Sequence, residues 1–493
     1  MILRITNPQK SLHRDVPSCE GTSHNKTQYL YIMNKTLRIL PVSLMLAVAT
    51  ICGAQDNNPS ESGVIALNPD ESYPVASDIP VLTFKEKSIY VPNDLRKMDL
   101  DDPESKWSYK RMVSTPDVAL FWAKEFGPDI TKAPDLDGHN MKVDLANLMA
   151  KLQHFYDFFY KDLAFVKPGT KADKYKMMVM LDYSLEGTAY GGDYDGQIGA
   201  LWIAPNRVQD RNLNCIAHEL GHSFQLQISC DGEGEAWGGA GMFEMASQWM
   251  LWQVNPEWQK DERFHLDAFA DLTHKAFLHI DNIYHSPYVL EIWGEKHGRP
   301  FIAELFRQGK VGEDPAMTYM RINKMNQKAF NDEMFDIYRR LVNWDIDRVR
   351  EYTRGYTDIW HTDLTDAGNG WKRISVKNAP ENYGFNVIPV EVPASGKSVK
   401  VDFRGEAGHK GYITTNKKNA GWKYGFVAID NEGKAHYGDM HSAAKGSLIF
   451  KNNGDISKLW LVVMGAPSKH IRNVDGPDNP GDPQYPYSIK TIY

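Results

Sequence analysis

The chain has 493 residues, with 56 basic and 63 acidic side chains and a formal charge of −7. This length allows two or three domains, since a domain usually takes about 100–200 residues. The mildly acidic balance, without a long basic run, argues against a nucleic-acid partner, because such binding depends on neutralising phosphates. Apart from one apolar run near the start, no stretch approaches the roughly 20 residues of a membrane span.

The N-terminal residues follow the pattern of an export signal. Residues 1–32 are polar and irregular, and we interpret them as an extension that precedes the natural start at Met33. Two basic residues then precede an apolar stretch, 39–51, and small residues precede Gln55. This order is typical of a signal peptide, which we place at 33–54. We therefore expect an exported protein whose mature chain begins at Gln55.

The cysteines leave one alternative open at the N-terminus. Cys52 would carry a lipid anchor, but this interpretation is weaker because the bulky Ile51 stands where such a signal prefers a small residue. Farther along the chain, Cys215 and Cys230 are 15 positions apart. On one helix they would lie roughly 22 Å apart, far beyond the roughly 7 Å limit of a disulfide, so we expect two free thiols.

A linker and a mixed α/β region follow the export signal. Residues 55–80 are polar with little to bury, which predicts a linker. The next domain, 81–368, becomes almost entirely helical in its second part, from about 264 to 355. Before that part, the sequence predicts an amphipathic helix at 143–160, strands at 175–183 and 199–205, a helix at 212–228, a glycine-rich loop and a helix at 242–254.

The hydrophobic period changes after Gly368. Residues 398–403 alternate apolar and charged side chains, and the apolar runs that follow are separated by turns rich in Asn and Gly. Short strands at this spacing predict a β-sandwich, which we assign to 369–493. The expected fold class is therefore α+β, with a mixed sheet and helices first and an all-β domain last.

The pattern His-Glu-Leu-Gly-His at 218–222 suits a metal ion. His218 and His222 are four positions apart, so on a helix both imidazoles project from one face and can bind a single zinc ion. Glu219 lies beside that face and can accept a proton from a water at the metal. The apolar residues of this helix form a separate stripe, so the histidine face is not needed for the core.

A catalytic zinc site needs a third protein ligand besides the two histidines. No third histidine follows at short spacing, so we expect a carboxylate from Glu233, Glu235 or Glu244. The first two lie in the glycine-rich loop, which would hold a ligand poorly. Glu244 lies near the start of the next predicted helix, where packing fixes it, and we prefer it. The alternative is that Glu244 only favours the N-terminus of its helix.

The segment HELGHSFQ (218–225), with a glutamate 22 positions after His222, resembles the gluzincin zinc metallopeptidases. It is most similar to their enhancin-like, mucin-degrading branch. Together with FEMASQWM (243–250), PENYGFNVIP (380–389) and YPYSI (485–489), it also resembles an uncharacterised family of secreted bacterial proteins grouped with the metallopeptidases. The resemblance extends over roughly residues 115–493. The sequence lacks the Asn that precedes the third ligand in the best-studied gluzincins.

The resemblance implies a zincin-like catalytic domain at 81–368, with a mixed sheet, the HExxH helix and a helical C-terminal subdomain, ahead of the β-sandwich. It implies one zinc ion held by His218, His222 and Glu244. Zinc with Glu219 as general base would hydrolyse peptide bonds in proteins or glycoproteins.

Such a site also needs a donor for the oxyanion and a surface that binds the substrate. The developing oxyanion needs a donor, for which Tyr284, His285 and Tyr288 are candidates, although such residues more often belong to a core or rim. An extended substrate could also pair with a strand by strand addition. We assign that role to the backbone of Gly199, Ala200, Leu201 and Trp202.

Two other functions remain open. The first is a glycan-binding or adhesion protein that keeps a zincin scaffold without catalytic turnover. The second is a zinc hydrolase that acts on non-peptide bonds. The intact Glu219 counts against the first, because a retired site usually loses its base, and nothing in the sequence excludes the second. Glycan contact through the C-terminal domain would use aromatic side chains that more often fill a core, namely Trp422, Tyr424, Tyr437 and Trp460.

Overall fold

The computed structural model describes residues 86–493 apart from 240–241, 415 and 474–481. The predicted extension at 1–32, the signal peptide at 33–54, Cys52 and the linker at 55–80 lie outside the described residues. Every described residue belongs to one unit, Val42–Tyr493.

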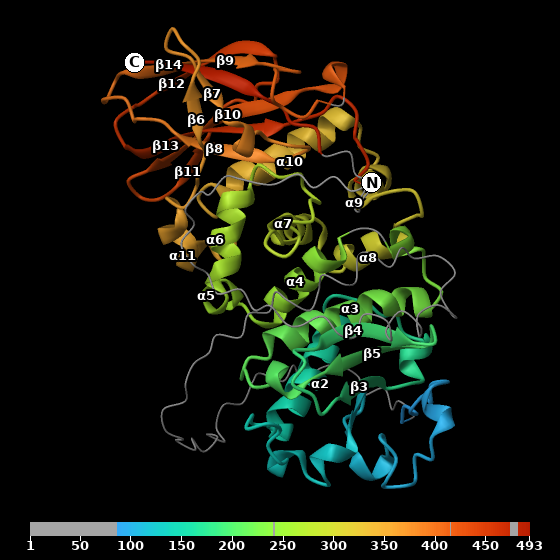
Figure 1. The fold of residues 1–493 in the computed structure, drawn as a ribbon. Helices are drawn as coiled ribbons and strands as arrows, with labels where there is room; N and C mark the ends of the chain where they lie inside the picture. The colour runs from blue at the N-terminus through green and yellow to red at the C-terminus, as the bar shows by residue number, and fades with distance from the viewer. Residues whose placement is uncertain (1–85, 240–241, 415, 474–481) are drawn as a thin grey trace, which may run out of the picture. The chain divides into compact units, whose positions relative to one another are not determined.

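A mixed five-stranded sheet comes first along the described chain (Figure 1). Its strands are β1 (Met112–Ser114), β2 (Val118–Trp122), β3 (Met177–Leu181), β4 (Ala189–Tyr194) and β5 (Ile198–Ile203). They follow the order β1-β2-β3-β5-β4, in which β2, β3 and β5 run parallel and the two outer strands are antiparallel to their neighbours. β2 and β3 are apolar and buried at every position, as parallel strands covered on both faces usually are.

The predicted strand at 199–205 corresponds to β5, which is an inner strand. β5 pairs with β3 on one side and with β4 on the other. The N–H of Gly199, which has no partner in β3, donates to Gln227 Oε1 at 2.7 Å. The backbone therefore has no open side for an extended peptide, and the predicted substrate strand is wrong for all four of its residues. These residues are Gly199, Ala200, Leu201 and Trp202.

A tight hairpin places β4, instead of β5, at the edge of the sheet. Asp195 and Gly196 both have positive φ, 54° and 62°, and the N–H of Gln197 donates to the carbonyl oxygen of Tyr194 at 2.8 Å. An Asp-Gly pair in this conformation forms the two-residue turn that matches the twist of antiparallel strands. The turn therefore folds β4 back along β5 and leaves the far side of β4 unpaired in the sheet.

Three helices carry the residues next to this sheet. α2 (Leu145–Lys161) begins after Asp144, whose side chain accepts the N–H of Asn147, and buries one apolar face. α3 (Asn214–Cys230) contacts β4, β5 and α2, and α4 (Phe243–Val254) packs along α3. The predicted helices at 143–160, 212–228 and 242–254 correspond to these three elements.

The region after α4 is helical, as its sequence predicts. Its helices are α5 (Trp258–Asp261), α6 (Arg263–Leu272), α7 (Tyr288–His297), α8 (Phe301–Gln308), α9 (Pro315–Ile322), α10 (Gln327–Leu341) and α11 (Arg350–Thr353). Short 3₁₀ helices occur throughout the described chain: Leu95–Lys97, Tyr109–Arg111, Lys124–Phe126, Ile130–Lys132, Lys171–Asp173, Pro205–Arg207, Ala236–Gly239, Arg354–Tyr356, Val376–Asn378 and Lys417–Asn419.

Two antiparallel sheets follow the helices. Their strands are β6 (Leu364–Asp366), β7 (Lys372–Ile374), β8 (Phe385–Pro389), β9 (Ser398–Gly405), β10 (Trp422–Asp430), β11 (Ala435–Tyr437), β12 (Lys445–Lys451), β13 (Ile456–Gly465) and β14 (Tyr487–Ile492). One sheet has the order β11-β10-β13-β8 and the other β12-β9-β14-β7-β6. The described chain is therefore a mixed α+β structure with several antiparallel pairings.

The strands β8, β10 and β13 of the four-stranded sheet are buried on both faces over most of their length. On one face, Phe426 belongs to a core that it shares with Phe403 of the five-stranded sheet. On the other face, Val427 and Val462 belong to the larger core that contains the helices. The predicted domains at 81–368 and 369–493 thus share packing, and β6 already joins the second sheet before residue 369.

Two simpler expectations can be compared with the described residues. No helix among them is long and apolar enough to cross a membrane. Cys215 and Cys230 both lie on α3, and no disulfide joins them, as their spacing predicts.

The packing between the two antiparallel sheets predicts a large cost for shortening Phe403. Its ring is 2% exposed and stacks on Tyr424 at a centroid distance of 3.9 Å. We expect Phe403→Ala to lower the free energy of unfolding by about 3–5 kcal/mol, measured by urea unfolding. Ile449→Ala, in the same sheet but 69% exposed, is the control and should change it by less than about 0.5 kcal/mol. Equal effects would contradict the shared core.

Candidate metal centre

The HExxH residues lie on α3, which approaches both α4 and the sheet closely. A Cβ atom added to Gly221 would lie 2.8 Å from Ser247 Oγ of α4, and one added to Gly191 of β4 would lie 1.9 Å from the carbonyl oxygen of Glu219. Glycine at position 191 therefore allows a backbone distance that any larger residue would prevent, and glycine at position 221 leaves room for the Ser247 side chain.

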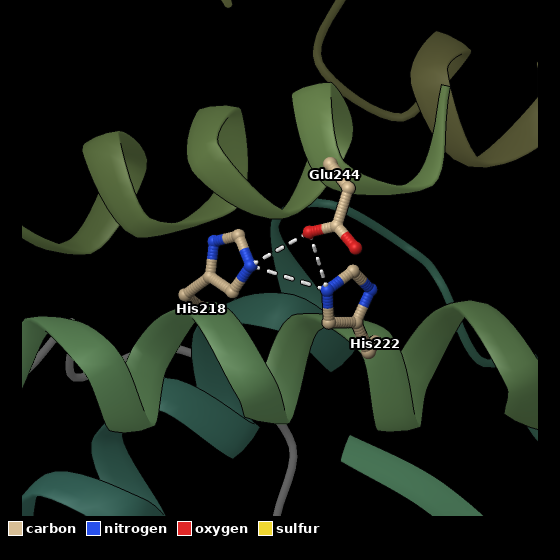
Figure 2. A group of neighbouring side chains, drawn as sticks. All are labelled: His218, His222 and Glu244. Atoms are coloured by element: carbon tan, nitrogen blue, oxygen red, sulfur yellow. Dashed lines mark hydrogen bonds and ion pairs between the residues drawn. The ribbon is translucent and has the colours of Figure 1, made fainter. Parts of the chain in front are cut away.

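Three side chains from the two helices converge at one point (Figure 2). Nε2 of His218 and Nε2 of His222 each lie 3.1 Å from Glu244 Oε2, and the two nitrogens lie 3.1 Å from each other. Their side chains are 5%, 11% and 13% exposed, so the group is largely buried but reaches solvent near Glu244. The structure thus brings together the three residues that the sequence predicts as ligands.

A glutamine sets the proton position on the His218 ring. Gln248 Nε2 donates to the carbonyl oxygen of Tyr284 at 2.9 Å, which fixes the orientation of the amide because a carbonyl can only accept. Gln248 Oε1 therefore faces His218 Nδ1 at 2.9 Å, and Nδ1 must donate. In the neutral ring, Nε2 then carries a lone pair that points at the convergence point.

A second glutamine does the same for His222. Gln225 Nε2 donates to the carbonyl oxygen of Phe243 at 3.0 Å and to Ser247 Oγ at 3.1 Å. Gln225 Oε1 consequently accepts from His222 Nδ1 at 3.0 Å. Metal-binding histidines almost always donate their other ring nitrogen in this way, which orients the ring and raises its basicity.

The convergence point therefore needs a positive charge. Two unprotonated nitrogens and a carboxylate oxygen repel one another at 3.1 Å unless a proton or a cation lies between them. Burial alone would lower the pKa of His222, yet the neighbouring Glu244 carboxylate raises it. Burial alone would raise the pKa of Glu244, yet His222 and His218 hold it below its usual range. The two shifts have one cause, because a proton on a histidine and the negative charge of Glu244 stabilise each other.

The donor set fits one zinc ion. Two imidazole nitrogens and one carboxylate are a common three-ligand set of catalytic zinc sites, with ligand distances of about 2.0–2.2 Å. Atoms separated by 3.1 Å can all lie at that distance from a single ion. His218, His222 and Glu244 would hold the ion, and Gln248 and Gln225 would orient the two rings.

Glu219 is buried beside this group at 3% exposure. Its Oε2 accepts the backbone N–H of Gly191 on the edge strand β4 at 3.0 Å. Burial raises the pKa of Glu219, and the Glu244 carboxylate acts in the same direction against the two histidines. Glu219 is thus a positioned carboxylate whose basicity is higher than that of an exposed glutamate, as a general base requires.

The other two acidic ligand candidates lie outside the centre. Glu233 Oε2 accepts from Arg307 Nε at 2.8 Å, and Glu235 Oε2 accepts the N–H of Val311 at 2.8 Å. Both carboxylates are therefore engaged by the region around α8, and Glu244 is the carboxylate that meets the histidines.

The three predicted oxyanion donors have different surroundings. Tyr284 is half-buried, and its ring lies against His218 with centroids 6.1 Å apart and planes at 24°. His285 Nδ1 contacts His265 Nδ1 at 2.6 Å. Tyr288 is completely buried, and its ring packs on Trp252 at a centroid distance of 5.6 Å. The prediction is therefore wrong for Tyr288, because packing among aromatic rings keeps its side chain from any substrate.

The predicted glycan-stacking aromatics are mostly core residues. Trp422, Tyr424 and Trp460 are 4%, 0% and 4% exposed, so they are not available for stacking on a sugar. Tyr437 is more exposed, but its hydroxyl donates to Asp345 at 2.7 Å. The burial of β10 and β13 on both faces explains this difference from the expectation.

A second group of possible ligands consists of His279, Glu381 and Asp482, whose ligand atoms lie within 4.8 Å of one another. Here Lys275 already supplies a positive charge, with its Nζ 3.5 Å from Glu381 Oε1. His279 Nδ1 accepts the N–H of Asp281, so Nε2 of the neutral ring carries the proton and faces Asp482. A protonated nitrogen cannot bind a metal, and we assign no ion to this group.

Three contributing residues lie outside the predicted set of ligands and general base. Gln248, Gln225 and Gly191 position the histidines and Glu219. Gln225 follows His222 by three positions and Gln248 follows Glu244 by four, so helical spacing places each near a ligand. The sequence carries no comparable signal for Gly191, because its partner Glu219 lies on a different element.

The centre predicts metal content that can be counted. Purified protein should contain about one zinc ion per chain by elemental analysis, and the double variant His218→Ala, His222→Ala should contain none, because two of three ligands are lost. The control is the double variant His361→Ala, His409→Ala. Both of these histidines lie outside the centre, so this variant should keep its zinc. Full occupancy in the double ligand variant would contradict the site.

The contact between β4 and α3 predicts that Gly191 tolerates no side chain. In Gly191→Ala, the added methyl group would meet the Glu219 carbonyl oxygen and the Cβ of His222, so α3 must move. We expect the free energy of unfolding to fall by about 1–3 kcal/mol, measured by urea unfolding, with a loss of bound zinc. Gly355→Ala, where a Cβ meets nothing within 4 Å, should change neither quantity. An unchanged Gly191→Ala variant would refute the close contact.

The chain is only weakly similar to solved structures. A xylan-binding CBM22 domain of Paenibacillus barcinonensis Xyn10C is 14% identical, covering 26% of this chain and 76% of its own, with a TM-score of 0.17. A functionally unknown conserved protein of Bacillus anthracis is 13% identical, covering 70% of this chain and 74% of its own, with a TM-score of 0.29. Similarities this weak carry no argument about function.

No curated protein matches the chain. One family model, described as a family of unknown function (DUF6055), matches residues 82–492. Because this match extends over most of the chain, the protein belongs to the DUF6055 family.

Proposed function

We propose that this protein is an exported, zinc-dependent metallopeptidase of the gluzincin type. The observation that supports the proposal is the convergence of His218, His222 and Glu244, with Glu219 buried beside them. In the same proposal, residues 81–368 form a zincin-like catalytic domain, in which α3 lies against the edge of a mixed sheet. Residues 369–493 form the accompanying β-sandwich.

The chemistry follows from the positions of these side chains. A zinc ion supplies a Lewis acid, which polarises a peptide carbonyl and lowers the pKa of a water molecule towards about 7. Glu219 accepts the proton of that water and later transfers it to the leaving amine. The Gly191 N–H orients the Glu219 carboxylate for both transfers, since it binds one of its two oxygens.

Substrate binding would use the edge strand. β4 pairs with β5 on one side only, so its far side offers backbone groups to an extended peptide. Gly191 belongs to this strand, which would place a bound peptide next to Glu219. Tyr284, half-buried against His218, is the donor that we assign to the developing oxyanion.

The substitution Glu219→Gln tests catalysis separately from metal binding. Glutamine keeps the size and the acceptor for Gly191 N–H but cannot take up a proton. The variant should keep its zinc and lose hydrolysis by a factor of about 10²–10⁴, measured by mass spectrometry of the fragments from an unglycosylated protein and a mucin-type glycoprotein. Glu235→Gln, outside the centre, is the control and should retain full activity.

The same assay separates the competing functions. Zinc binding without cleavage of either substrate by the wild-type protein would favour a binding protein or a hydrolase of non-peptide bonds. Cleavage that survives Glu219→Gln would place the chemistry elsewhere. Cleavage of the glycoprotein alone would define the substrate class.

A further inference from the structure

We propose that His265 is a positioning residue for the metal centre, acting through Gln248 on the ligand His218. His265 lies on α6 and is 5% exposed. Its Nε2 lies 3.1 Å from Gln248 Nε2, and its Nδ1 lies 2.6 Å from His285 Nδ1. This inference rests on the proposed metal site, because His218 is one of its ligands.

The direction of each hydrogen bond from His218 through Gln248 to His265 follows from the direction of the one before it. Gln248 Oε1 accepts from His218, so both amide hydrogens of Gln248 point away from the centre. One of them goes to the carbonyl oxygen of Tyr284 at 2.9 Å, and the other faces His265 Nε2. His265 Nε2 must therefore accept, which leaves the proton of the neutral ring on Nδ1.

His285 holds that proton in place at the outer end. With its Nδ1 only 2.6 Å from His265 Nδ1, His285 must accept where His265 donates. Burial, reinforced by His265, lowers the pKa of His285 to about 4, so the ring is neutral and able to accept at neutral pH. His285, one of the three predicted oxyanion donors, is therefore better explained as the last residue in a series of oriented hydrogen bonds.

One neighbouring charge competes for the same nitrogen. Glu262 Oε2 lies 3.4 Å from His265 Nε2, beyond the usual length of a hydrogen bond. The same oxygen accepts from Trp258 Nε1 at 2.8 Å, and the other oxygen accepts from Asn214 Nδ2 at 3.1 Å. The shorter contact, with Gln248, decides the direction at His265.

Removal of the acceptor at His265 should weaken the metal centre. The Gln248 amide would keep its contact with the Tyr284 carbonyl oxygen but lose the one with His265, so a single hydrogen bond would then oppose its rotation. After rotation, its NH₂ group would face His218 Nδ1, which would then have to accept, and the ring proton would move to Nε2. A protonated Nε2 points at the ion and cannot bind it. Loss of such supporting contacts typically lowers metal affinity by about 10–100-fold.

The central experiment measures zinc affinity by competition with a chelator. His265→Phe keeps the ring contacts with Trp258 and Phe264 but offers no hydrogen bond. We expect its zinc dissociation constant to rise by about 10–100-fold. His265→Gln restores an acceptor and a donor and should recover most of the affinity. His274→Phe is the control, because His274 is similarly buried but takes no part in this series of hydrogen bonds, and this variant should bind zinc normally.

A double variant distinguishes positioning from a general packing effect. If His265 acts through Gln248, the combination of His265→Phe with Gln248→Met should bind zinc no more weakly than Gln248→Met alone. Losses that multiply would overturn the inference, as would unchanged affinity in His265→Phe. His265→Leu takes the place of the phenylalanine variant if the latter does not fold. A wild-type protein that binds no zinc would overturn the proposed function as well, whereas the other failures affect this inference alone.

Discussion

Three hydrogen-bond acceptors face one another between α3 and α4, and the region around them is organised by this contact. The carbonyl groups of Gln248 and Gln225 turn the donor side of each imidazole away from the centre. The remaining lone pairs of His218 and His222 meet the Glu244 carboxylate at 3.1 Å. Such a group is stable only with a positive charge inside it, which either a proton or a metal cation can supply.

The approach of α3 to the sheet depends on small residues. Gly191 and Gly199 allow the helix backbone to lie directly against β4 and β5, where any Cβ would overlap with it. Ser223 on the helix donates from its hydroxyl to the carbonyl oxygen of Ala200 at 2.7 Å, which satisfies a buried polar group in this tight contact. The same closeness brings the Glu219 carboxylate under a backbone N–H of the edge strand. The packing of α3 on the sheet and the position of Glu219 therefore depend on the same small residues.

The C-terminal sheets are part of the same packing unit as the helices. The four-stranded sheet has apolar side chains on both faces, and one of these faces belongs to the core that contains the helices. Arg339 of α10 donates to the carbonyl oxygen of Gly438 at 2.7 Å, and Lys423 of β10 pairs with Asp332 of α10. The aromatic side chains of β10 and β13 are therefore used for packing, which explains why they are not exposed to a ligand.

Much of the local structure could be predicted from the sequence, because it depends on neighbours within a few positions. The spacing of His218 and His222 places both rings on one helical face, and the apolar spacing of 143–160 and the alternation at 398–403 predict a helix and a strand that the structure contains. Glu244 could also be predicted from the sequence. A ligand must be held by a rigid element, and only one of the three acidic candidates belongs to a predicted helix.

The tertiary structure alone decided which elements lie side by side. Strand order made β5 an inner strand, and aromatic packing buried Tyr288, although neither outcome has a local signature. The direction of each hydrogen bond around His218 likewise depends on Gln248, Tyr284 and His265, which are distant in sequence. The sequence by itself determined the ligand types and their spacing on one helix. Their orientation and proton positions were decided by long-range contacts, because a hydrogen bond takes its direction from both partners.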